Sequence, residues 1–142
     1  MQTENTPSTR QLEFMQRESR GDIRFWSTLG MKLIAAGSGW AKVRLPFSPE
    51  LANGAGMLHG GAVFAAADAA IGVAAMGLLS SDENVATIEM KINFMKPVAA
   101  GEIVADAVIH HKGRHTAVGE ASVTDAAGRL VAKALGTFAV LR

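Results

Sequence analysis

The chain has 142 residues, enough for one domain with a continuous core, and its nearly half apolar composition excludes a disordered chain. Fourteen Lys and Arg residues against 13 Asp and Glu leave a net charge of +1, so no strong field draws the protein to nucleic acid or to an acidic surface. The absence of cysteine excludes disulfides, thiolate metal sites and a cysteine nucleophile, and it suits a reducing cytosol.

The N-terminal part of the chain is predicted to be a tail followed by helices. Its first ten residues, MQTENTPSTR, lack the apolar core of a secretory signal, so we expect a cytoplasmic protein. Residues 1–8 are interpreted as a flexible tail. Residues 9–29 are predicted to form a helical extension, with one helix over 9–20 and a short turn of helix that carries Phe25 and Trp26. The apolar residues available to the packed face of the first helix are Leu12, Phe14 and Met15.

Strand patterns occupy two parts of the chain. Residues 31–36 and 40–47 are predicted to form a short strand pair, because the GSG between them is typical of a turn. From residue 86 to residue 94 the apolar residues recur at every second position. That period predicts a half-buried strand whose polar side carries Thr87.

Three further strands are predicted over 102–111, 115–125 and 129–141. The short links between these strands, PVAAGE, KGR and DAAGR, indicate antiparallel neighbours, so we expect a four-strand meander. A sheet with one apolar face would bury that face on the only large apolar helix. The sequence therefore predicts a single α+β domain over 1–142 in which the sheet curls around a helix.

That helix lies in the apolar stretch MLHGGAVFAAADAAIGVAAMGLL, which contains one carboxylate, Asp68. The run is long enough to span a membrane, but a carboxylate near mid-bilayer costs about 2.5–3.5 kcal/mol on insertion scales, so we expect a helix buried in a soluble protein. At 100° per residue the helix has two stripes. The first stripe is Phe64, Asp68, Ile71, Ala75 and Leu79, and the second consists of small side chains, Ala62, Ala66, Ala70, Val73 and Gly77.

Asp68 is predicted to point among apolar groups, where an unpaired carboxylate is costly or takes up a proton. It is either a structural residue bonded to a nearby hydroxyl or amide, or a catalytic group. The HGG sequence at the start of the helix favours the second interpretation. Gly60 and Gly61 lie where free backbone N–H groups and the positive helix end suit an oxyanion. A buried acid and oxyanion donors together supply both halves of acyl-transfer chemistry.

The spacing between these two groups requires a second chain. His59 and Asp68 are nine residues apart, about 13 Å along a helix, so one copy cannot place both around one carbonyl carbon. If two helices run antiparallel across a two-fold axis, Asp68 of each approaches the Gly60 end of the other. The spacing therefore predicts an obligate dimer, provided that the two groups act together.

The combined motifs cover most of the chain, from about Leu33 to Val140. They are Asn53, the HGG at 59–61, Asp68 and Gly72, followed by TIEMKINFMKPVAAGE and the KGR turn. This pattern resembles the hotdog-fold acyl-CoA thioesterases, in particular the phenylacetic-acid-degradation (PaaI-like) group. The resemblance implies a five- to six-stranded antiparallel sheet wrapped around one long central helix. It also implies a double-hotdog homodimer that often forms a homotetramer, a dimer of dimers.

Carried over position by position, the resemblance implies that Asp68 is the general base or nucleophile and that the Gly60 N–H binds the thioester oxygen. His59 and Asn53 orient the carbonyl and the attacking water in that scheme, and Thr87 matches a Ser/Thr position that holds the water. Asp68 and Thr87 come from one subunit and the other three residues from its neighbour. Two structural alternatives stay open: Thr87 as an ordinary surface threonine, and His59 as a residue that only caps or braces the turn.

The substrate implied by the resemblance, an acyl-CoA, carries several phosphate charges and needs a local basic patch. The KGR turn, Lys112, Gly113 and Arg114, is the candidate, and Gly61 and Phe64 are further substrate-binding candidates. No metal or cofactor is expected, because HHKGRH has no matching acidic or thiolate ligands and coenzyme A is part of the substrate. The residues expected near the acyl pocket are Phe25, Trp26, Phe64, Ile71 and Met76.

The sequence therefore favours hydrolysis of an acyl-CoA thioester by a homo-oligomer that binds neither nucleic acid nor membrane. One alternative is a hotdog dehydratase or hydratase, which characteristically pairs His with an acid in a different motif. The other is a non-catalytic acyl-CoA-binding protein, which needs no acid at position 68. The acyl group stays open between aryl-acetyl, other aromatic and medium-chain groups.

Overall fold

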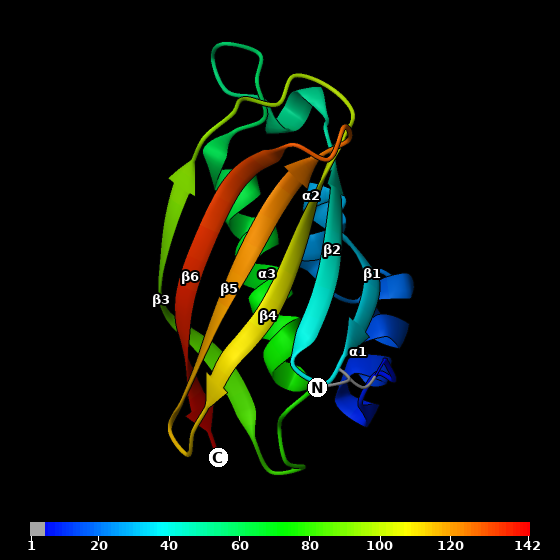
Figure 1. The fold of residues 1–142 in the computed structure, drawn as a ribbon. Helices are drawn as coiled ribbons and strands as arrows, with labels where there is room; N and C mark the ends of the chain where they lie inside the picture. The colour runs from blue at the N-terminus through cyan, green and yellow to red at the C-terminus, as the bar shows by residue number, and fades with distance from the viewer. Residues whose placement is uncertain (1–4) are drawn as a thin grey trace.

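The structure is a computed structural model that describes residues 5–142, so residues 1–4 of the expected tail lie outside it (Figure 1). Six strands in the described part form one antiparallel sheet that curves around the long helix α3, which confirms the predicted α+β arrangement. No helix among residues 5–142 has the length and apolar character needed to cross a bilayer. The elements in chain order are α1 (Thr9–Ser19), α2 (Arg24–Leu29), β1 (Lys32–Gly37), β2 (Trp40–Pro46), η1 (Pro49–Leu51), α3 (Gly60–Met76), β3 (Asn84–Phe94), β4 (Glu102–Lys112), β5 (Thr116–Asp125) and β6 (Leu130–Leu141).

The strand order in the sheet is β1-β2-β4-β5-β6-β3, so the predicted four-strand meander is wrong for β3. β4, β5 and β6 are consecutive neighbours, but β3 pairs with β6 at the far edge. The link between β3 and β4 explains the difference, because it crosses the end of the sheet. The carbonyl of Val98 in this link accepts from the Leu58 N–H at 2.7 Å, and that of Gly101 accepts from the Phe47 N–H at 2.8 Å. β4 is thereby brought beside β2.

The helix α3 buries a wide arc of its surface, because the curved sheet wraps around it (Figure 1). The predicted stripe of small residues faces the core over Ala62, Ala66, Ala70 and Val73. The other predicted stripe divides: Ile71 and Ala75 are fully buried, whereas Phe64 is 36% exposed and Asp68 is half-buried. The side of α3 that remains open carries Gly61, Phe64, Ala65, Asp68, Ala69, Gly72 and Met76.

Glycine permits the close packing of α3 at two places. A Cβ atom added at Gly119 of β5 would lie 2.8 Å from Cγ2 of Ile71, and one added at Gly77 would lie 2.4 Å from the carbonyl oxygen of Gly37. Real Cβ atoms do not approach other heavy atoms so closely, so a side chain at either position would push α3 away from its neighbours. These contacts fix the height of α3 over the sheet and hence the position of the residues on its open side.

The helix α1 packs on the molecule through a polar residue. Ser8 caps this helix: its hydroxyl accepts from the backbone N–H of Gln11, whose side-chain oxygen accepts from the Ser8 N–H. The side chain of Gln11 is fully buried and its Nε2 donates to the carbonyls of Gly37, at 2.9 Å, and Val73, at 3.0 Å. Leu12, predicted for the packed face, is 46% exposed instead. The buried carbonyls of Gly37 and Val73 need a hydrogen-bond donor. Gln11 supplies this donor and therefore takes the buried position, which a leucine side chain could not do.

Candidate active site

The carboxylate of Asp68 and the hydroxyl of Thr87 meet in the structure. Asp68 lies in the middle of α3 on its open side, and Thr87 comes from the edge strand β3. The Oγ1 of Thr87 donates to Oδ1 of Asp68 at 2.7 Å. The second carboxylate oxygen has no hydrogen bond among the described residues, so it is free to accept a proton or to attack.

A β-bulge explains why Thr87 reaches Asp68. The alternation in the sequence placed Thr87 on the strand face opposite Met90 and Ile92, and that prediction is wrong. The pairing of β3 with β6 is irregular between Thr87 and Glu89, where Ile88 is the extra residue. Such a bulge shifts the alternation by one position, so Thr87 before it and Met90 after it both face α3.

His59 is the N-cap of α3, so its imidazole caps the start of this helix. Its Nδ1 accepts from the Gly61 N–H at 2.8 Å, and its backbone N–H donates to the carbonyl of Leu51 at 2.8 Å. Because Nδ1 is the acceptor, the proton of the neutral imidazole lies on Nε2, which is available for donation from this exposed residue. A Cβ atom at Gly61 would lie 2.9 Å from Nδ1, so only glycine leaves room for this imidazole position.

Gly60 presents an unpaired donor at the start of α3. The N–H of Gly61 bonds to His59 Nδ1 and that of Ala62 bonds to the His59 carbonyl at 2.9 Å, but no partner for the Gly60 N–H is recorded among residues 5–142. Phe94 of β3 packs over this glycine: a Cβ atom at Gly60 would lie 3.3 Å from its ring. The helix start therefore offers one free N–H beside an aromatic ring.

Asn53 stands in the loop that leads to His59, and its side chain already holds that loop. Its Oδ1 accepts from the N–H groups of Ala55, at 2.9 Å, and Met57, at 3.1 Å. The loop is closed by the bond from His59 to the Leu51 carbonyl. The exposed Nδ2 of Asn53 is the part of the side chain that remains for a ligand.

The candidate residues thus form two groups in one chain. Asp68 and Thr87 form the first, and Asn53, His59 and Gly60 form the second. Gly60 and Asp68 are eight residues apart on α3, which is about 12 Å along the helix axis. One chain does not bring the two groups around a single carbonyl carbon.

The KGR turn is partly neutralised by a residue that the sequence analysis missed. Glu83 is 2% exposed, and its carboxylate accepts from Lys112 at 2.8 Å and from Arg142 at 2.5 Å. The hydrogen bond from Lys112 is the main cause that lowers the pKa of Glu83 to about 2, with help from the Ser80 N–H and the two cations. The partners lie 29 and 59 residues away in the chain, so no local pattern could reveal them.

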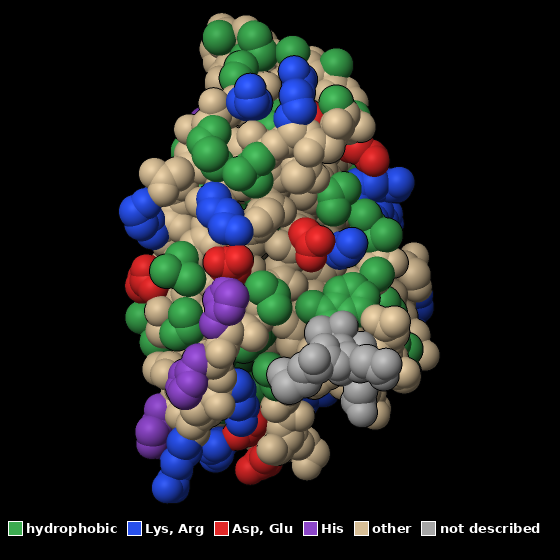
Figure 2. Space-filling model, viewed as in Figure 1, with side chains coloured by type: hydrophobic (Ala, Val, Ile, Leu, Met, Phe, Trp, Pro, Cys, Tyr) green, Lys and Arg blue, Asp and Glu red, His purple; other side chains and the backbone are tan. Residues whose placement is uncertain are grey.

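Arg114 remains the free cation of this turn. Its side chain is exposed and has no recorded partner in the described part of the chain, although its carbonyl accepts from Arg142 at 2.8 Å. Gly113 donates its N–H to the Thr116 carbonyl at 2.7 Å and closes the turn. Figure 2 shows histidine and Lys/Arg side chains gathered at this end of the sheet. A basic surface therefore exists here even though Lys112 is paired.

Hollows lie near both ends of α3. One of about 330 Å³ adjoins His59 and Gly61 and has an apolar lining that includes Phe25, Leu29 and Leu51. Glu50 stands at its rim, where the Ser48 hydroxyl lowers the pKa of this carboxyl. Of the residues expected near an acyl pocket, Phe25 lines this hollow and Met76 lines another at the far end of α3, whereas Trp26 and Ile71 belong to the core.

Comparison with known proteins agrees with this architecture. A relative from Saccharolobus solfataricus, named as a candidate esterase, is 36% identical over 80% of this chain and 81% of its own. The 1,4-dihydroxy-2-naphthoyl-CoA hydrolase of Listeria monocytogenes is 30% identical over 80% of this chain and 92% of its own. A solved variant of the phenylacetic acid degradation protein PaaI from Thermus thermophilus has a TM-score of 0.76 at 28% identity, over 83% of this chain and 99% of that one.

The sheet curled around α3 is therefore a hotdog fold, as found in PaaI proteins. The profile of the thioesterase superfamily matches residues 55–132, which contain both α3 and the Asp68–Thr87 pair. The chain belongs to the thioesterase superfamily.

Proposed function

We propose that this protein hydrolyses acyl-CoA thioesters with Asp68 as the general base or nucleophile. The observation that carries the proposal is the 2.7 Å bond from Thr87 to Asp68, because it holds a carboxylate from the helix and a hydroxyl from the edge strand at one point on the open side of α3. The Listeria relative acts on a coenzyme A thioester by its name, which supports the same substrate class here.

In the proposed reaction, a water oxygen attacks the thioester carbonyl carbon while Asp68 takes the proton from the water. The Gly60 N–H of the other subunit donates to the oxyanion that forms, and His59 Nε2–H donates to the same carbonyl. The C–S bond then breaks, and the proton passes to the sulfur, which leaves as free coenzyme A together with the carboxylic acid. A direct attack by Asp68 through an anhydride gives the same products after hydrolysis.

Two features of the single chain support a dimer. The open side of α3, on which Asp68 lies, is flanked by β3, whose outer edge has no strand partner in the described chain. This region exposes large apolar side chains: Ile88 is 58% exposed and Phe94 54%. Pairing two copies here in antiparallel fashion covers these side chains and brings Gly60 of each copy toward Asp68 of the other. A dimer of dimers is the larger assembly that we propose.

The direct test is the release of free thiol from a panel of acyl-CoAs by the protein and by the variant Asp68→Asn. The variant keeps an acceptor for Thr87 and the shape of the side chain but loses the base, so we expect kcat to fall by about 10³-fold with the dimer intact by solution mass. Because the chain has no cysteine, it adds no thiol background. Turnover of Asp68→Asn at the wild-type rate would rule out the assignment, and binding without turnover by the wild type would indicate a non-catalytic acyl-CoA-binding protein.

A further inference from the structure

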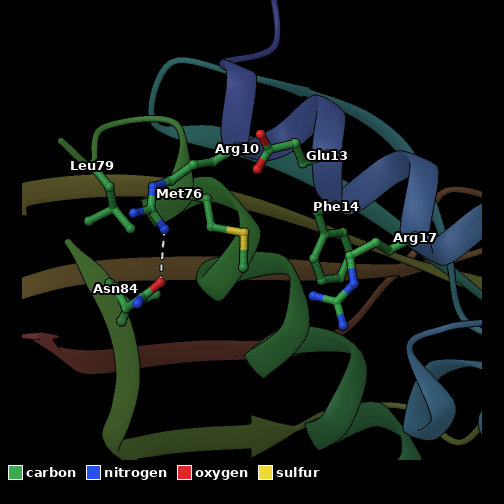
Figure 3. A pocket seen from close by; sticks show the side chains of 8 residues that line it. Arg10, Glu13, Phe14, Arg17, Met76, Leu79 and Asn84 are labelled. Carbon is green, nitrogen blue, oxygen red and sulfur yellow. Dashed lines mark hydrogen bonds between the residues drawn. The ribbon is translucent and has the colours of Figure 1, made fainter. Parts of the chain in front are cut away.

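A hollow between α1, the end of α3 and the start of β3 has no part in the reaction described above. Its volume is about 180 Å³. A cavity of about 150 Å³ accommodates benzene, so the hollow has room for an aromatic ring or a short aliphatic chain. Four apolar and four polar residues line it: Phe14, Met76, Leu79 and Val85, and Arg10, Glu13, Arg17 and Asn84 (Figure 3).

The hollow lies on the same open side of α3 as Asp68, toward the C-terminal end of the helix. Gly72 and Met76 follow Asp68 at intervals of four residues and lie on the same open side of α3. On β3, Val85 precedes Thr87 by two residues, about 7 Å, and both side chains are on the strand face toward α3. Gly72 has no side chain to block the path. A group attached at a carbonyl beside Asp68 therefore extends over Gly72 into the hollow.

The rim of the hollow is positively charged. Arg10 is fixed by a bond to Asn84 Oδ1 at 2.8 Å, which Figure 3 shows, and by a bond to the Ser81 carbonyl at 2.7 Å. Arg17 lines the same hollow, and its guanidinium has neither a hydrogen bond nor an ion pair within residues 5–142. Glu13 is the one acidic residue among those that line the hollow. The hollow beside His59 has an ionised Glu50 at its rim instead, so it is the less suitable of the two for an anion.

We propose that the hollow binds the acyl group and that Arg17 selects acyl groups that end in a carboxylate, as in the monothioester of a dicarboxylic acid with coenzyme A. The proposal rests on the proposed function, because Asp68 marks the position of the thioester. The apolar body of the acyl group packs on Phe14, Met76 and Val85, and its terminal carboxylate accepts two parallel bonds from the planar guanidinium of Arg17. The chemistry of the thioester cleavage is unchanged.

The test compares 4-carboxybenzoyl-CoA with benzoyl-CoA, which differ only at the far end of the ring. For the wild type we expect kcat/KM to be at least about tenfold higher for 4-carboxybenzoyl-CoA, and for Arg17→Gln we expect the ratio of the two kcat/KM values to fall to about one. Arg20→Gln is the matched control, because it removes the same charge from the exposed end of α1, where Arg20 pairs with Asp22 at 3.0 Å. We expect Arg20→Gln to keep the wild-type preference for 4-carboxybenzoyl-CoA over benzoyl-CoA.

Three outcomes overturn the proposal: a wild type that turns over benzoyl-CoA as well as or better than 4-carboxybenzoyl-CoA, an equal effect of Arg17→Gln on both substrates, or weaker inhibition of Arg17→Gln than of the wild type by free coenzyme A. Either of the last two results would mean that Arg17 binds a phosphate of coenzyme A and not the carboxylate of the acyl group. A second measurement separates this proposal from the proposed function. Calorimetry measures the Kd of 4-carboxybenzoyl-CoA and of benzoyl-CoA for Asp68→Asn and for the double variant that also carries Arg17→Gln. We expect the carboxylate to strengthen binding at least about tenfold in Asp68→Asn and not in the double variant.

If no thioester is cleaved but this difference in binding is present, the subsite stands and the proposed function fails. If thioesters are cleaved and the difference is absent, the proposed function stands and the subsite fails. If the Asp68→Asn protein binds neither thioester, the subsite fails as well.

Discussion

The hydroxyl of Thr87 orients the Asp68 carboxylate, and the conservative variants of this residue separate orientation from packing. Thr87→Ser keeps the donor, and Thr87→Val keeps the shape and loses the donor. Since a hydrogen bond to a charged group contributes about 1.5–3 kcal/mol, we expect kcat of Thr87→Val to fall by about tenfold or more and that of Thr87→Ser to stay near the wild-type value. Steady-state thiol release measures both. Equal rates for the two variants would show that the bond has no part in turnover.

At the same scale, the sequence singled out candidate site residues but did not predict where all of their side chains point. Asp68, His59 and Gly60 could be chosen from residue type and spacing, because a lone acid on an apolar helix and an HGG helix start each have a physical meaning. The side of β3 on which Thr87 lies could not be predicted, because a bulge at Ile88 leaves no signature in the two-residue alternation. Glu83 was missed because its cationic partners are remote in the chain.

At the scale of elements, the fit between α3 and its neighbours depends on the absence of a side chain at Gly77. A methyl group there would meet the Gly37 carbonyl at 2.4 Å, and this contact is to rigid backbone. We expect Gly77→Ala to lower the free energy of unfolding by about 1–3 kcal/mol, as overpacked core positions do. Gly54→Ala is the control: a Cβ atom there meets nothing within 4 Å, so its effect stays within about 0.5 kcal/mol. Urea unfolding of the two variants measures the difference, and equal stabilities would contradict the contact.

Element boundaries followed closely from the periodicity of the sequence, but the order of the strands did not. Each predicted strand and helix is present, with ends shifted by a few residues. The position of β3 beside β6 depends on where the Val98 link crosses, and this depends on hydrogen bonds to the Leu58 and Phe47 backbone that no sequence rule specifies. Short links between strands therefore predicted the neighbours correctly for β1 with β2 and within β4 to β6, but not for β3.

At the scale of the whole molecule, the proposed sharing of the site between two subunits predicts complementation between two defective chains. A mixed dimer of Asp68→Asn and His59→Ala contains one site with both groups intact and one site with neither. When the mixed dimer is isolated through two different tags, we expect about half of the wild-type activity, while each variant alone is nearly inactive. Activity of the mixed dimer no greater than that of the single variants would show that each site is built from one chain.

The stability of the whole molecule is also predicted to depend on Glu83 below neutral pH. Its pKa falls from 4.5 in the unfolded chain to about 2 in the folded protein, so its ionised form stabilises the fold above pH 4.5. This contribution is lost as the pH falls from about 4.5 to about 2. We expect Glu83→Gln to be less stable than the wild type at pH 7 and the gap to narrow over that range in thermal unfolding. Asp82→Asn, at an exposed neighbour, is the control, and a gap independent of pH would contradict the prediction.

The buried amide of Gln11 has a consequence for how such a chain can diversify. It helps to seat α1 by bonding to two main-chain carbonyls, which are present whatever side chains stand at those two positions. The helix also lies outside residues 55–132, the segment matched by the superfamily profile. Substitutions on the outward face of α1 can therefore change the lining of the hollow between α1 and α3 and leave the Asp68–Thr87 pair untouched.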